Sequence, residues 1–292
     1  MTFPDSVKLV EVGPRDGLQS IENLISTAEK IQYVNLLSSA GVSEIEVTSF
    51  VSPKWVPQLA DAKEVSSQIE QNENIIYTAL VPNRKGLEGA LESGYKSVAI
   101  FTAASETFSQ KNTNCSIDES FQRFEAMKPM WEANQIRVRG YISTCWVCPY
   151  EGIISIEKVS DVVQKLVDLG ISEISLGDTI GKADPDSVEE LLDSLLSDFS
   201  SSLFALHFHD TFGNALDNIR KGLEYGIGIY DSSAGGIGGC PFAPGASGNV
   251  STEAVVDLCI KEKIRSGVDR DLLEKAGKFI QSATLQTKVA TS

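Results

Sequence analysis

Basic residues are scarce in this sequence, and several common features are missing from it. Lysine and arginine number 25 against 40 aspartates and glutamates, which gives a formal net charge of −15. Because nucleic-acid binding requires a positively charged surface, we expect no nucleic-acid partner. The apolar runs are strand-length, well short of the roughly 20 residues that cross a bilayer, so no membrane association is expected. The first residues lack the basic and apolar segments of a signal peptide.

Cysteine is also sparse, with five residues in the whole chain. An odd number of cysteines in a large chain is typical of free thiols in a reducing compartment, so we predict a cytoplasmic protein. Cys145 and Cys148 have the C-x-x-C spacing, but a zinc site would usually need a second such pair, which the sequence lacks. A redox pair would open a thioredoxin-like helix, whereas this run follows a predicted strand. The pattern therefore favours two structural cysteines.

Short β-branched runs alternate with longer amphipathic segments along the whole chain. The predicted strands are residues 7–12, 44–49, 75–81, 97–102, 137–143, 173–176, 204–209 and 229–233. Several are apolar at consecutive positions, as expected for parallel strands that are buried on both faces. Eight strands, each followed by a helix or a long connection, predict an α/β fold, a closed (β/α)8 TIM barrel. A doubly wound open sheet is the alternative, but no G-x-G-x-x-G run follows the first strand.

Neither a low-complexity linker nor a change in composition divides the chain. We therefore predict a single catalytic domain over residues 1–292, in which residues 268–292 form a helical C-terminal extension. There is a weak internal repeat, because residues 178–181 and 210–213 both have the pattern D-T-x-G at a predicted strand end. Successive copies of one βα unit would produce such a repeat.

The chain has only two histidines, and both lie in the run Leu206-His207-Phe208-His209-Asp210. Alternate residues of a strand share a face, so His207 and His209 point to one side and Phe208 to the other. Two imidazoles at one strand end can bind a single metal ion. Two structural histidines placed by chance are the alternative. Every histidine of the chain at this spacing, beside an aspartate, favours metal binding.

The first predicted strand ends at a pair of opposite charges, Arg15 and Asp16. TIM-barrel active sites lie at the carboxyl ends of the strands, so both residues are site candidates. Unpaired charges at a buried rim are costly, and an Arg–Asp pair that only closes the rim is the structural alternative. In the second strand, Glu44 and Glu46 share a face and would need a cation inside a barrel, for which Arg15 is available. Solvated strand-end acids are the alternative there.

Two further candidates follow later strands. Asp178 ends the sixth predicted strand, and Cys240 lies in the glycine-rich run from Gly235 to Asn249 that follows the eighth. So many glycines allow a loop to approach a ligand closely, but the run has no lysine or arginine and lacks the P-loop spacing. A cysteine in such a rim loop is a candidate acid or nucleophile, with a small buried thiol as the alternative.

These candidates have the residue types of one kind of site. Asp16, His207, His209 and one further oxygen ligand could bind Mg²⁺ or Mn²⁺, and would also accept Zn²⁺. Such an ion can polarise a carbonyl or hydroxyl group of an anionic substrate. Arg15 could stabilise an enolate nearby, and Cys240 could transfer a proton. The set therefore favours making or breaking a carbon–carbon bond beside a carbonyl group.

Five long runs of the sequence together resemble the 3-hydroxy-3-methylglutaryl-CoA (HMG-CoA) lyase family, of the DRE-TIM metallolyase superfamily. They are Glu11-Val-Gly-Pro-Arg-Asp-Gly-Leu-Gln19, Thr48-Ser-Phe-Val-Ser-Pro-Lys-Trp-Val-Pro57, Ser175-Leu-Gly-Asp-Thr-Ile-Gly181, His207-Phe-His-Asp-Thr211 and Gly238-Gly-Cys-Pro-Phe-Ala-Pro-Gly-Ala-Ser-Gly-Asn249. The resemblance extends from about Val7 to the C-terminal helices, and its motifs are mutually consistent.

The resemblance implies a TIM barrel that binds Mg²⁺ or Mn²⁺, a CoA-thioester substrate and a homodimer. The implied metal ligands are Asp16, His207, His209 and Asn249. Five residues have implied catalytic roles. Arg15 stabilises the enolate of acetyl-CoA, Glu46 holds that arginine, and Cys240 transfers a proton and covers the site. Asp178 lies near the substrate, and Glu253 is a further acid linked to catalysis.

The implied reaction is a retro-Claisen cleavage of HMG-CoA to acetyl-CoA and acetoacetate. The tertiary hydroxyl group is deprotonated, the bond to the carbon alpha to the thioester breaks, and the leaving enolate is protonated, with Cys240 as a donor or relay. The base is left open between Asp16, His207 and a water molecule at the metal. A role in leucine degradation or ketone-body formation is implied by the family and not by the residues.

Two differences from animal members of the family affect the expected location. No mitochondrial leader precedes the barrel, and residues 287–292 lack a cysteine and a peroxisomal ending. We therefore expect a bacterial-type cytoplasmic enzyme without terminal-thiol redox control.

Three alternatives to the cleavage of HMG-CoA are compatible with the sequence. They are a lyase for a longer branched 3-hydroxyglutaryl-CoA, a Claisen-type synthase (isopropylmalate or homocitrate synthase) and an inactive scaffold barrel. The loop with Cys240 and the short C-terminus disfavour the synthase, and the complete set of ligands disfavours the scaffold. Pocket shape would decide between the two lyases.

Overall fold

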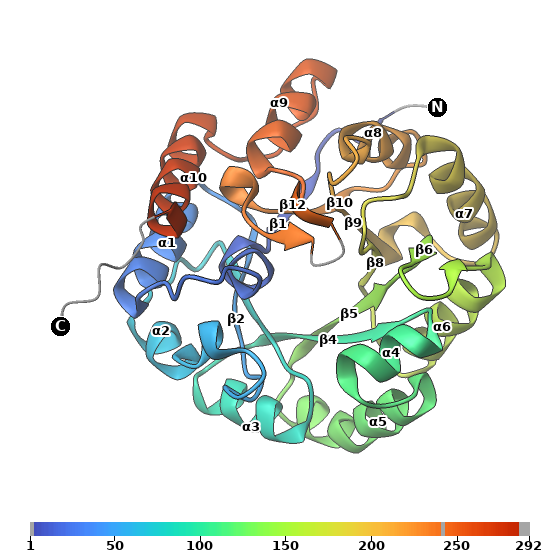
Figure 1. Ribbon diagram of the computed structural model, residues 1–292, viewed down its shortest axis with the longest axis horizontal. Helices are drawn as coiled ribbons and strands as arrows, with labels where there is room; N and C mark the ends of the chain where they lie inside the picture. Colours follow the sequence, from blue (N-terminus) through green and yellow to red (C-terminus); the bar gives the residue numbers. More distant parts are fainter. Residues whose placement is uncertain (1–2, 241–242, 286–292) are drawn as a thin grey trace.

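The eight predicted strands form a closed parallel barrel in the computed structural model (Figure 1). The structure describes residues 3–240 and 243–285, except for the side chains of residues 240 and 243–247. The barrel strands are β1 (Lys8–Glu11), β2 (Glu44–Ser49), β3 (Ile76–Leu80), β4 (Ser97–Ala103), β5 (Arg137–Ser143), β8 (Ile174–Asp178), β9 (Phe204–Phe208) and β10 (Ile229–Ser232). Around the barrel they follow the order β1-β10-β9-β8-β5-β4-β3-β2, and β2 closes the ring by pairing with β1. The (β/α)8 TIM barrel predicted from the sequence is confirmed.

Helices surround the barrel (Figure 1). They are α1 (Thr27–Ser39), α2 (Ala62–Gln68), α3 (Arg84–Glu92), α4 (Glu106–Thr113), α5 (Ile117–Ala133), α6 (Ile156–Asp168), α7 (Pro185–Asp198), α8 (Ala215–Glu224), α9 (Thr252–Glu262) and α10 (Arg270–Leu285). Their starts have a local cause in the sequence. At α1 the hydroxyl group of Ser26 accepts the N–H of Glu29, whose carboxylate accepts the N–H of Ser26. At α7 Asp184 is the N-cap and Pro185 the first helical residue.

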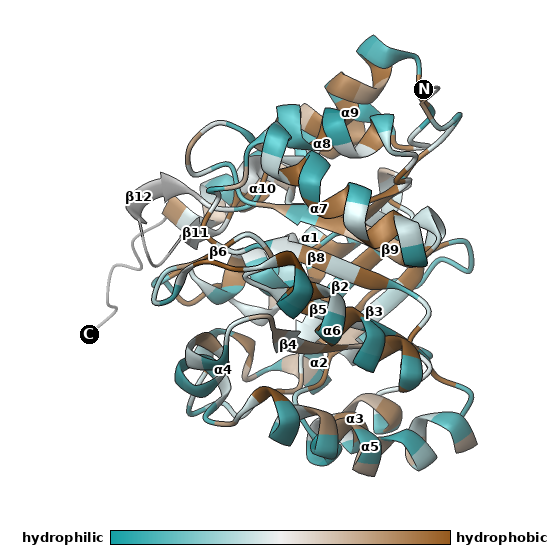
Figure 2. Ribbon diagram, turned by 90° about the vertical axis from the view of Figure 1, so that its right-hand side faces the viewer, coloured by the Kyte–Doolittle hydropathy of each residue, from teal (hydrophilic) through white to brown (hydrophobic). Residues whose placement is uncertain are grey.

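Short elements lie in the connections. They are η1 (Gly13–Gly17), η2 (Pro57–Leu59), η3 (Ser201–Leu203), η4 (Ala234–Gly236) and the hairpins β6–β7 (Val147–Cys148 and Gly152–Ile153) and β11–β12 (Gly239–Cys240 and Ala243–Ser247). The sequence did not predict either hairpin, because strands of two residues have no periodic pattern. Figure 2 shows β6, β11 and β12 together at one end of the barrel, where the carboxyl ends of the strands lie. Within the described residues, no helix is long and apolar enough to cross a membrane.

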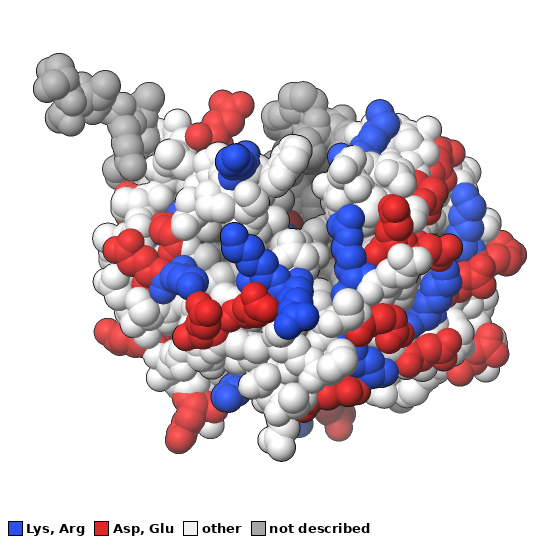
Figure 3. Space-filling view, turned by 90° about the horizontal axis from the view of Figure 1, so that it is seen from below, with Lys and Arg blue, Asp and Glu red and all other residues white. Residues whose placement is uncertain are grey.

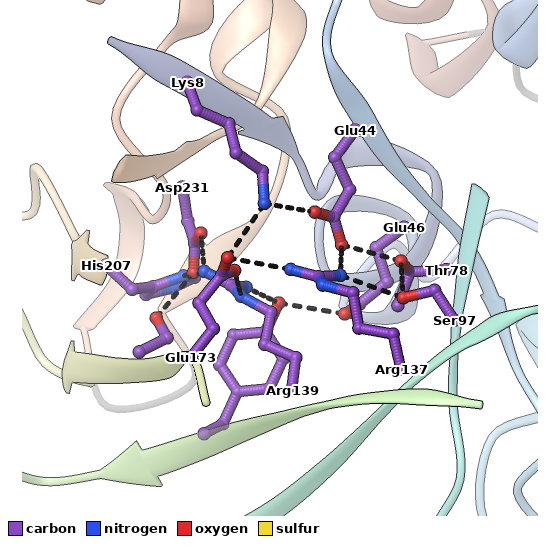
Figure 4. A network of polar contacts seen from close by, with 12 residues as sticks. Lys8, Glu44, Glu46, Thr78, Ser97, Arg137, Arg139, Glu173, His207 and Asp231 are labelled. Carbon is purple, nitrogen blue, oxygen red and sulfur yellow. Dashed lines mark hydrogen bonds and ion pairs between the residues drawn. The ribbon is translucent and has the colours of Figure 1, made fainter. Parts of the chain in front are cut away.

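The barrel strands separate an apolar outer layer from a polar interior. Ile45 of β2 and Val138 of β5 belong to the hydrophobic core beneath the helices. The residues on the opposite strand face include Glu44, Glu46 and Arg139, which are also fully buried and pair with charges from other parts of the chain (Figure 4). This division follows from the alternation of side chains along a strand. A layer of paired charges therefore fills the barrel under the site.

The outer surface carries mixed charge. On the face seen in Figure 3, basic and acidic side chains are interspersed. Ion pairs such as Lys63–Glu92 (2.7 Å) and Lys165–Asp118 (2.6 Å) join neighbouring helices. Solvent screens exposed pairs of this kind, so packing of the helices on the strands contributes more to stability.

Candidate metal centre and active site

Three of the four predicted metal ligands form one cluster at the carboxyl end of the barrel. A carboxylate oxygen of Asp16 and one ring nitrogen each of His207 and His209 lie within 4.8 Å of one another. The fourth, Asn249, donates a hydrogen bond of 2.9 Å from Nδ2 to Asp16 Oδ2. The fold thus brings together residues from opposite ends of the sequence, and we call these four the ligand cluster.

The η1 turn places Asp16 in the cluster. The N–H groups of Arg15, Asp16 and Gly17 all lie near the carbonyl oxygen of Val12, at 3.2, 2.7 and 3.2 Å. This is one turn of π-helix, a form often found at functional sites. Gly13 is required at its start, because a Cβ atom there would overlap the hydroxyl group of Tyr33. The glycines of this run therefore serve the backbone turn that directs Arg15 and Asp16 inward.

Asn249 is placed by pairing with the end of β9. It forms an antiparallel bridge with His209, and the flanking N–H groups of Asp210 and Val250 donate to Gly248 and Phe208 at 2.7 and 3.2 Å. The backbone of Gly238 also lies close to the side chain of Asn249. It has φ +119°, and a Cβ atom there would lie 2.8 Å from Asn249 Nδ2. The glycine-rich run after β10 thus returns its last residue to the histidine strand.

The donor atoms of the cluster fit a divalent cation. Asn249 Oδ1 and His209 Nδ1 are buried and have no hydrogen-bond partner among the described residues. Burial and the neighbouring His207 lower the pKa of His209 to about 4, so it is neutral at pH 7. Burial would raise the pKa of Asp16, but Arg15 and the two histidines lower it to about 2. A neutral imidazole and an ionised carboxylate are the forms that bind metals.

Arg15 is buried beside the cluster and contacts two carboxylates. Its Nη1 atom donates to Asp16 Oδ1 and its Nε atom to Glu46 Oε1. The pKa of Arg15 is raised above its usual value, because the pull of Glu46 and Asp16 outweighs the effect of burial. The predicted contact between Glu46 and Arg15 is therefore present, and Arg15 also pairs with Asp16. A solvated position for Glu46 was a wrong alternative, since this side chain is 0% exposed.

Glu44 lies on the same strand face but belongs to a different group of charges. It pairs with Lys8 at 2.6 Å and with Arg137 at 2.9 Å, toward the amino end of the barrel. It is fully buried, so the interpretation as a solvated acid is wrong for Glu44 too. Arg15, the cation that the sequence offered for both glutamates, pairs with Glu46, while Glu44 pairs with Lys8 and Arg137.

The structure does not join the remaining two predicted acids to the cluster by hydrogen bonds. Both oxygens of Asp178 accept backbone N–H groups of its own turn, from Lys182 and Ala183 at 3.0 Å each. Burial raises its pKa to about 6, although those N–H groups oppose the shift. The carboxylate of Glu253, at the start of α9, accepts the N–H of Gly235 at 2.9 and 3.0 Å. It thus holds the turn from which the glycine-rich run begins.

The structure describes the side chains of four of the five cysteines, which are all free and buried. Cys145 donates to the carbonyl of Ile142 at 3.1 Å and Cys148 to Ser105 Oγ at 3.0 Å. Both are free and buried, as the structural interpretation of the C-x-x-C run predicts. The backbone of Cys240 lies in β11, but its side chain falls outside the described part of the chain, as do residues 287–292.

Sequence reasoning missed the residues that support the cluster from below. Asp231 of β10 accepts hydrogen bonds from His207 Nδ1 (3.2 Å), Arg139 Nη2 (2.5 Å) and Ser175 Oγ (2.7 Å) (Figure 4). A carboxylate on Nδ1 fixes the tautomer in which Nε2 is free to bind metal. One signal was available, because Arg139 and Tyr141 alternate with apolar residues in a strand predicted to be buried.

The fold and the site together define a (β/α)8 barrel with a candidate metal centre at the carboxyl ends of its strands. The HMGL-like family model matches residues 6–280, and the chain belongs to this family. It is 50% identical over 282 residues to the mitochondrial hydroxymethylglutaryl-CoA lyase of Macaca fascicularis, covering 97% of this chain and 87% of the relative. It is 49% identical to the 3-hydroxy-3-isohexenylglutaryl-CoA/hydroxymethylglutaryl-CoA lyase of Pseudomonas aeruginosa, covering 96% and 93%.

Solved structures give the same result. The HMG-CoA lyase of Bacillus subtilis matches with a TM-score of 0.96 and 45% identity, over 97% of this chain and 95% of that one. An HMG-CoA lyase from Acinetobacter baumannii, solved in complex with coenzyme A and 3-methylmalate, matches with a TM-score of 0.92 and 37% identity, over 97% and 93%. The resemblance inferred from the five sequence runs is confirmed.

Proposed function

We propose that this chain cleaves HMG-CoA to acetyl-CoA and acetoacetate in a metal-dependent reaction. The observation that carries the proposal is the contact between Arg15 and Asp16, which places a buried guanidinium group directly beside the ligand cluster. Membership in the HMGL-like family and relatives named HMG-CoA lyases support this function over a synthase. The complex of the Acinetobacter baumannii relative with coenzyme A supports a CoA thioester as the substrate.

Asp16, His207, His209 and Asn249 would hold the metal. Their two nitrogens and two hard oxygens suit Mg²⁺ or Mn²⁺. When bound, the ion polarises the hydroxyl and carbonyl groups of the substrate and makes the hydroxyl group easier to deprotonate. Asp16 or a water molecule at the metal would take that proton, because His207 would have Nδ1 on Asp231 and Nε2 on the metal.

Arg15 would act on the other half of the substrate. Its position between Glu46 and Asp16 fixes the guanidinium group before the substrate binds, so that little reorganisation is needed as charge develops. When the bond to the carbon alpha to the thioester breaks, the electron pair moves onto the leaving fragment as an enolate. Arg15 would stabilise this enolate, and Cys240 would supply or relay the proton that converts it to acetyl-CoA.

Two acids would support the reaction without binding the metal. Asp178 would organise the β8 turn near the substrate, since its carboxylate is held by the turn's own N–H groups. Glu253 would position the glycine-rich run by holding the N–H of Gly235 at its first turn. Both roles predict effects on turnover without a matching loss of metal affinity.

We also propose that the chain is one catalytic domain that works as a homodimer, in the cytoplasm, in leucine degradation or ketone-body formation. The four buried free thiols of the described residues suit a reducing compartment. Relatives are named as mitochondrial and as cytoplasmic enzymes, so the family itself includes both locations.

A comparison of two substrates tests the proposed specificity. With saturating Mg²⁺, kcat/KM is measured for HMG-CoA and for 3-hydroxy-3-isohexenylglutaryl-CoA, the longer substrate in the name of the Pseudomonas aeruginosa relative. We expect HMG-CoA to have the higher kcat/KM. If only the longer thioester were cleaved, HMG-CoA would not be the substrate, but the class of reaction would stand.

A further inference from the structure

We propose that Tyr141 is a positioning residue for the cleavage, because its hydroxyl group holds Glu46 and, through Glu46, the guanidinium group of Arg15. This inference rests on the proposed function, in which Arg15 stabilises the enolate. Tyr141 comes from β5 and is buried in the barrel interior, under the ligand cluster. We assign it a role that acts through Glu46 and Arg15 and not through contact with the substrate.

The hydroxyl group of Tyr141 accepts one hydrogen bond and donates another. Arg139 Nη1 donates to it at 2.6 Å, and it donates to Glu46 Oε2 at 2.8 Å. The direction is fixed because an arginine can only donate, so the single hydroxyl proton goes to Glu46. Glu46 therefore has one donor on each oxygen, with Tyr141 on Oε2 and Arg15 on Oε1.

The ring of Tyr141 is packed among the same groups. The Cζ atoms of Arg15 and Arg139 lie 5.5 and 4.7 Å from its centroid, within the range of cation–π contacts. The ring of His207 meets it edge-on, with centroids 6.4 Å apart and an interplanar angle of 89°. These contacts hold the ring in one orientation, with its hydroxyl group directed at Glu46.

Tyr141 thus joins the two halves of the site. On one side, Arg139 binds Asp231, which accepts the hydrogen bond from His207. On the other side, Glu46 binds Arg15. Both halves end in the ligand cluster, at His207 and at Asp16. Removal of the Tyr141 hydroxyl group would break the hydrogen-bonded path between Arg139 and Glu46.

The effect of Tyr141→Phe follows from which contacts remain. Glu46 Oε2 loses its donor in a buried site, so the carboxylate can rotate and Arg15 is no longer held in one position. His207 keeps Asp231, and Asp231 keeps Arg139 Nη2. Because misplacement of a reacting group by about 1 Å costs up to about 100-fold in rate, we expect kcat to fall about 10- to 100-fold. KM and the affinity for Mn²⁺ should stay within about threefold.

The matched control is Tyr95→Phe. Tyr95 is another buried tyrosine whose hydroxyl group has a side-chain partner, Ser66 Oγ at 2.8 Å, but it packs against Phe50 outside the barrel interior. Both variants lose one buried hydroxyl group, with two side-chain hydrogen bonds at Tyr141 and one at Tyr95. A role of Tyr141 in stability alone predicts equal kinetics for the two variants.

The experiment combines kinetics with a signal that does not depend on turnover. Steady-state cleavage of HMG-CoA and Mn²⁺ calorimetry are measured for the wild type, Tyr141→Phe and Tyr95→Phe. The Nε–H signals of ¹⁵N-arginine-labelled protein are recorded in EDTA, and the signal of Arg15 is assigned by its loss in Arg15→Gln. We expect Tyr141→Phe, and not Tyr95→Phe, to lower kcat and to shift or broaden the Arg15 signal.

Two results would overturn the inference. One is an unchanged Arg15 signal with wild-type kcat in Tyr141→Phe, and the other is an equal loss of kcat in both variants. Failure of the proposed function is distinct from these, because the wild type itself would then release no acetoacetate. In that case the Arg15 signal still tests whether Tyr141 positions the guanidinium group.

Discussion

His207 and Asp231 are paired both by backbone register and by side chain. Their Cα atoms are partners across β9 and β10, and His207 Nδ1 lies 3.2 Å from Asp231 Oδ2. The pairing turns the other ring nitrogen of His207 toward the ligand cluster. It also ties a metal ligand to the buried charges that fill the barrel, since Asp231 pairs with Arg139.

We expect Asp231→Asn to weaken Mn²⁺ binding about 10- to 100-fold, because the second partner of a ligating histidine fixes its tautomer and basicity. Calorimetry on the purified variant measures this. Ser175→Ala is the control, since it removes the 2.7 Å hydrogen bond to the same carboxylate but keeps the charge. An unchanged affinity in Asp231→Asn, or an equal loss in both variants, would contradict the role of Asp231.

Arg15→Gln should abolish turnover and leave metal affinity nearly intact. The loss of an electrostatic stabiliser of a developing anion lowers kcat by about 100- to 1,000-fold. Asp16 keeps its 2.9 Å hydrogen bond from Asn249 in this variant, so the cluster stays in place. Activity and Mn²⁺ affinity are measured on the same preparation. A loss of affinity as large as the loss of activity would show that Arg15 is structural.

The two D-T-x-G turns provide a matched pair of glycine substitutions. Gly181 and Gly213 have φ of +71° and +82°, so alanine is strained at both by about 1 kcal/mol. Only at Gly181 would a Cβ atom meet neighbours, Thr211 Cβ at 2.8 Å and His209 O at 2.9 Å. We expect Gly181→Ala to be the more destabilising in urea unfolding, by about 1–3 kcal/mol, and to weaken metal binding. Equal free energies of unfolding would contradict the close approach at Gly181.

The raised pKa of Glu11 predicts that the stability of the protein depends on pH. Glu11 is not a member of the ligand cluster. Burial raises its pKa from 4.5 to about 7, although hydrogen bonds from Thr252, Ala234 and Gly13 oppose the shift. Between these values the unfolded chain loses the proton first, so stability falls as the pH rises from 4.5 to 7 and then stays level. At about 1.4 kcal/mol per pH unit, the loss is on the order of 3 kcal/mol.

Glu11→Gln isolates this contribution. Urea unfolding of the wild type and the variant is measured at pH 5 and pH 8 in EDTA, so that metal binding does not add to the stability of either. We expect the wild type to lose more stability than the variant between the two values. Parallel behaviour of the two proteins would show that Glu11 is ionised in the folded state throughout.

Local patterns predicted the fold and the ligand cluster because their signals lie within short segments. Each predicted strand lies within two residues of a barrel strand at both ends, and the barrel rule then placed Asp16 beside the histidines. The supporting charges could not be found this way. Arg139 and Asp231 are 92 positions apart, and Tyr141 and Glu46 are 95 apart. Which buried charges pair across a barrel depends on the register of its strands, which no single segment specifies.

The most direct test of the account is the cleavage of HMG-CoA by the purified chain, with and without EDTA. Acetoacetate and acetyl-CoA are quantified after incubation with Mg²⁺, after chelation, and after Mg²⁺ or Mn²⁺ is restored. We expect both products in equal amounts with the metal, none after chelation, and recovery when the metal is returned. No cleavage in the presence of the metal, or undiminished cleavage in EDTA, would contradict a metal-dependent HMG-CoA lyase.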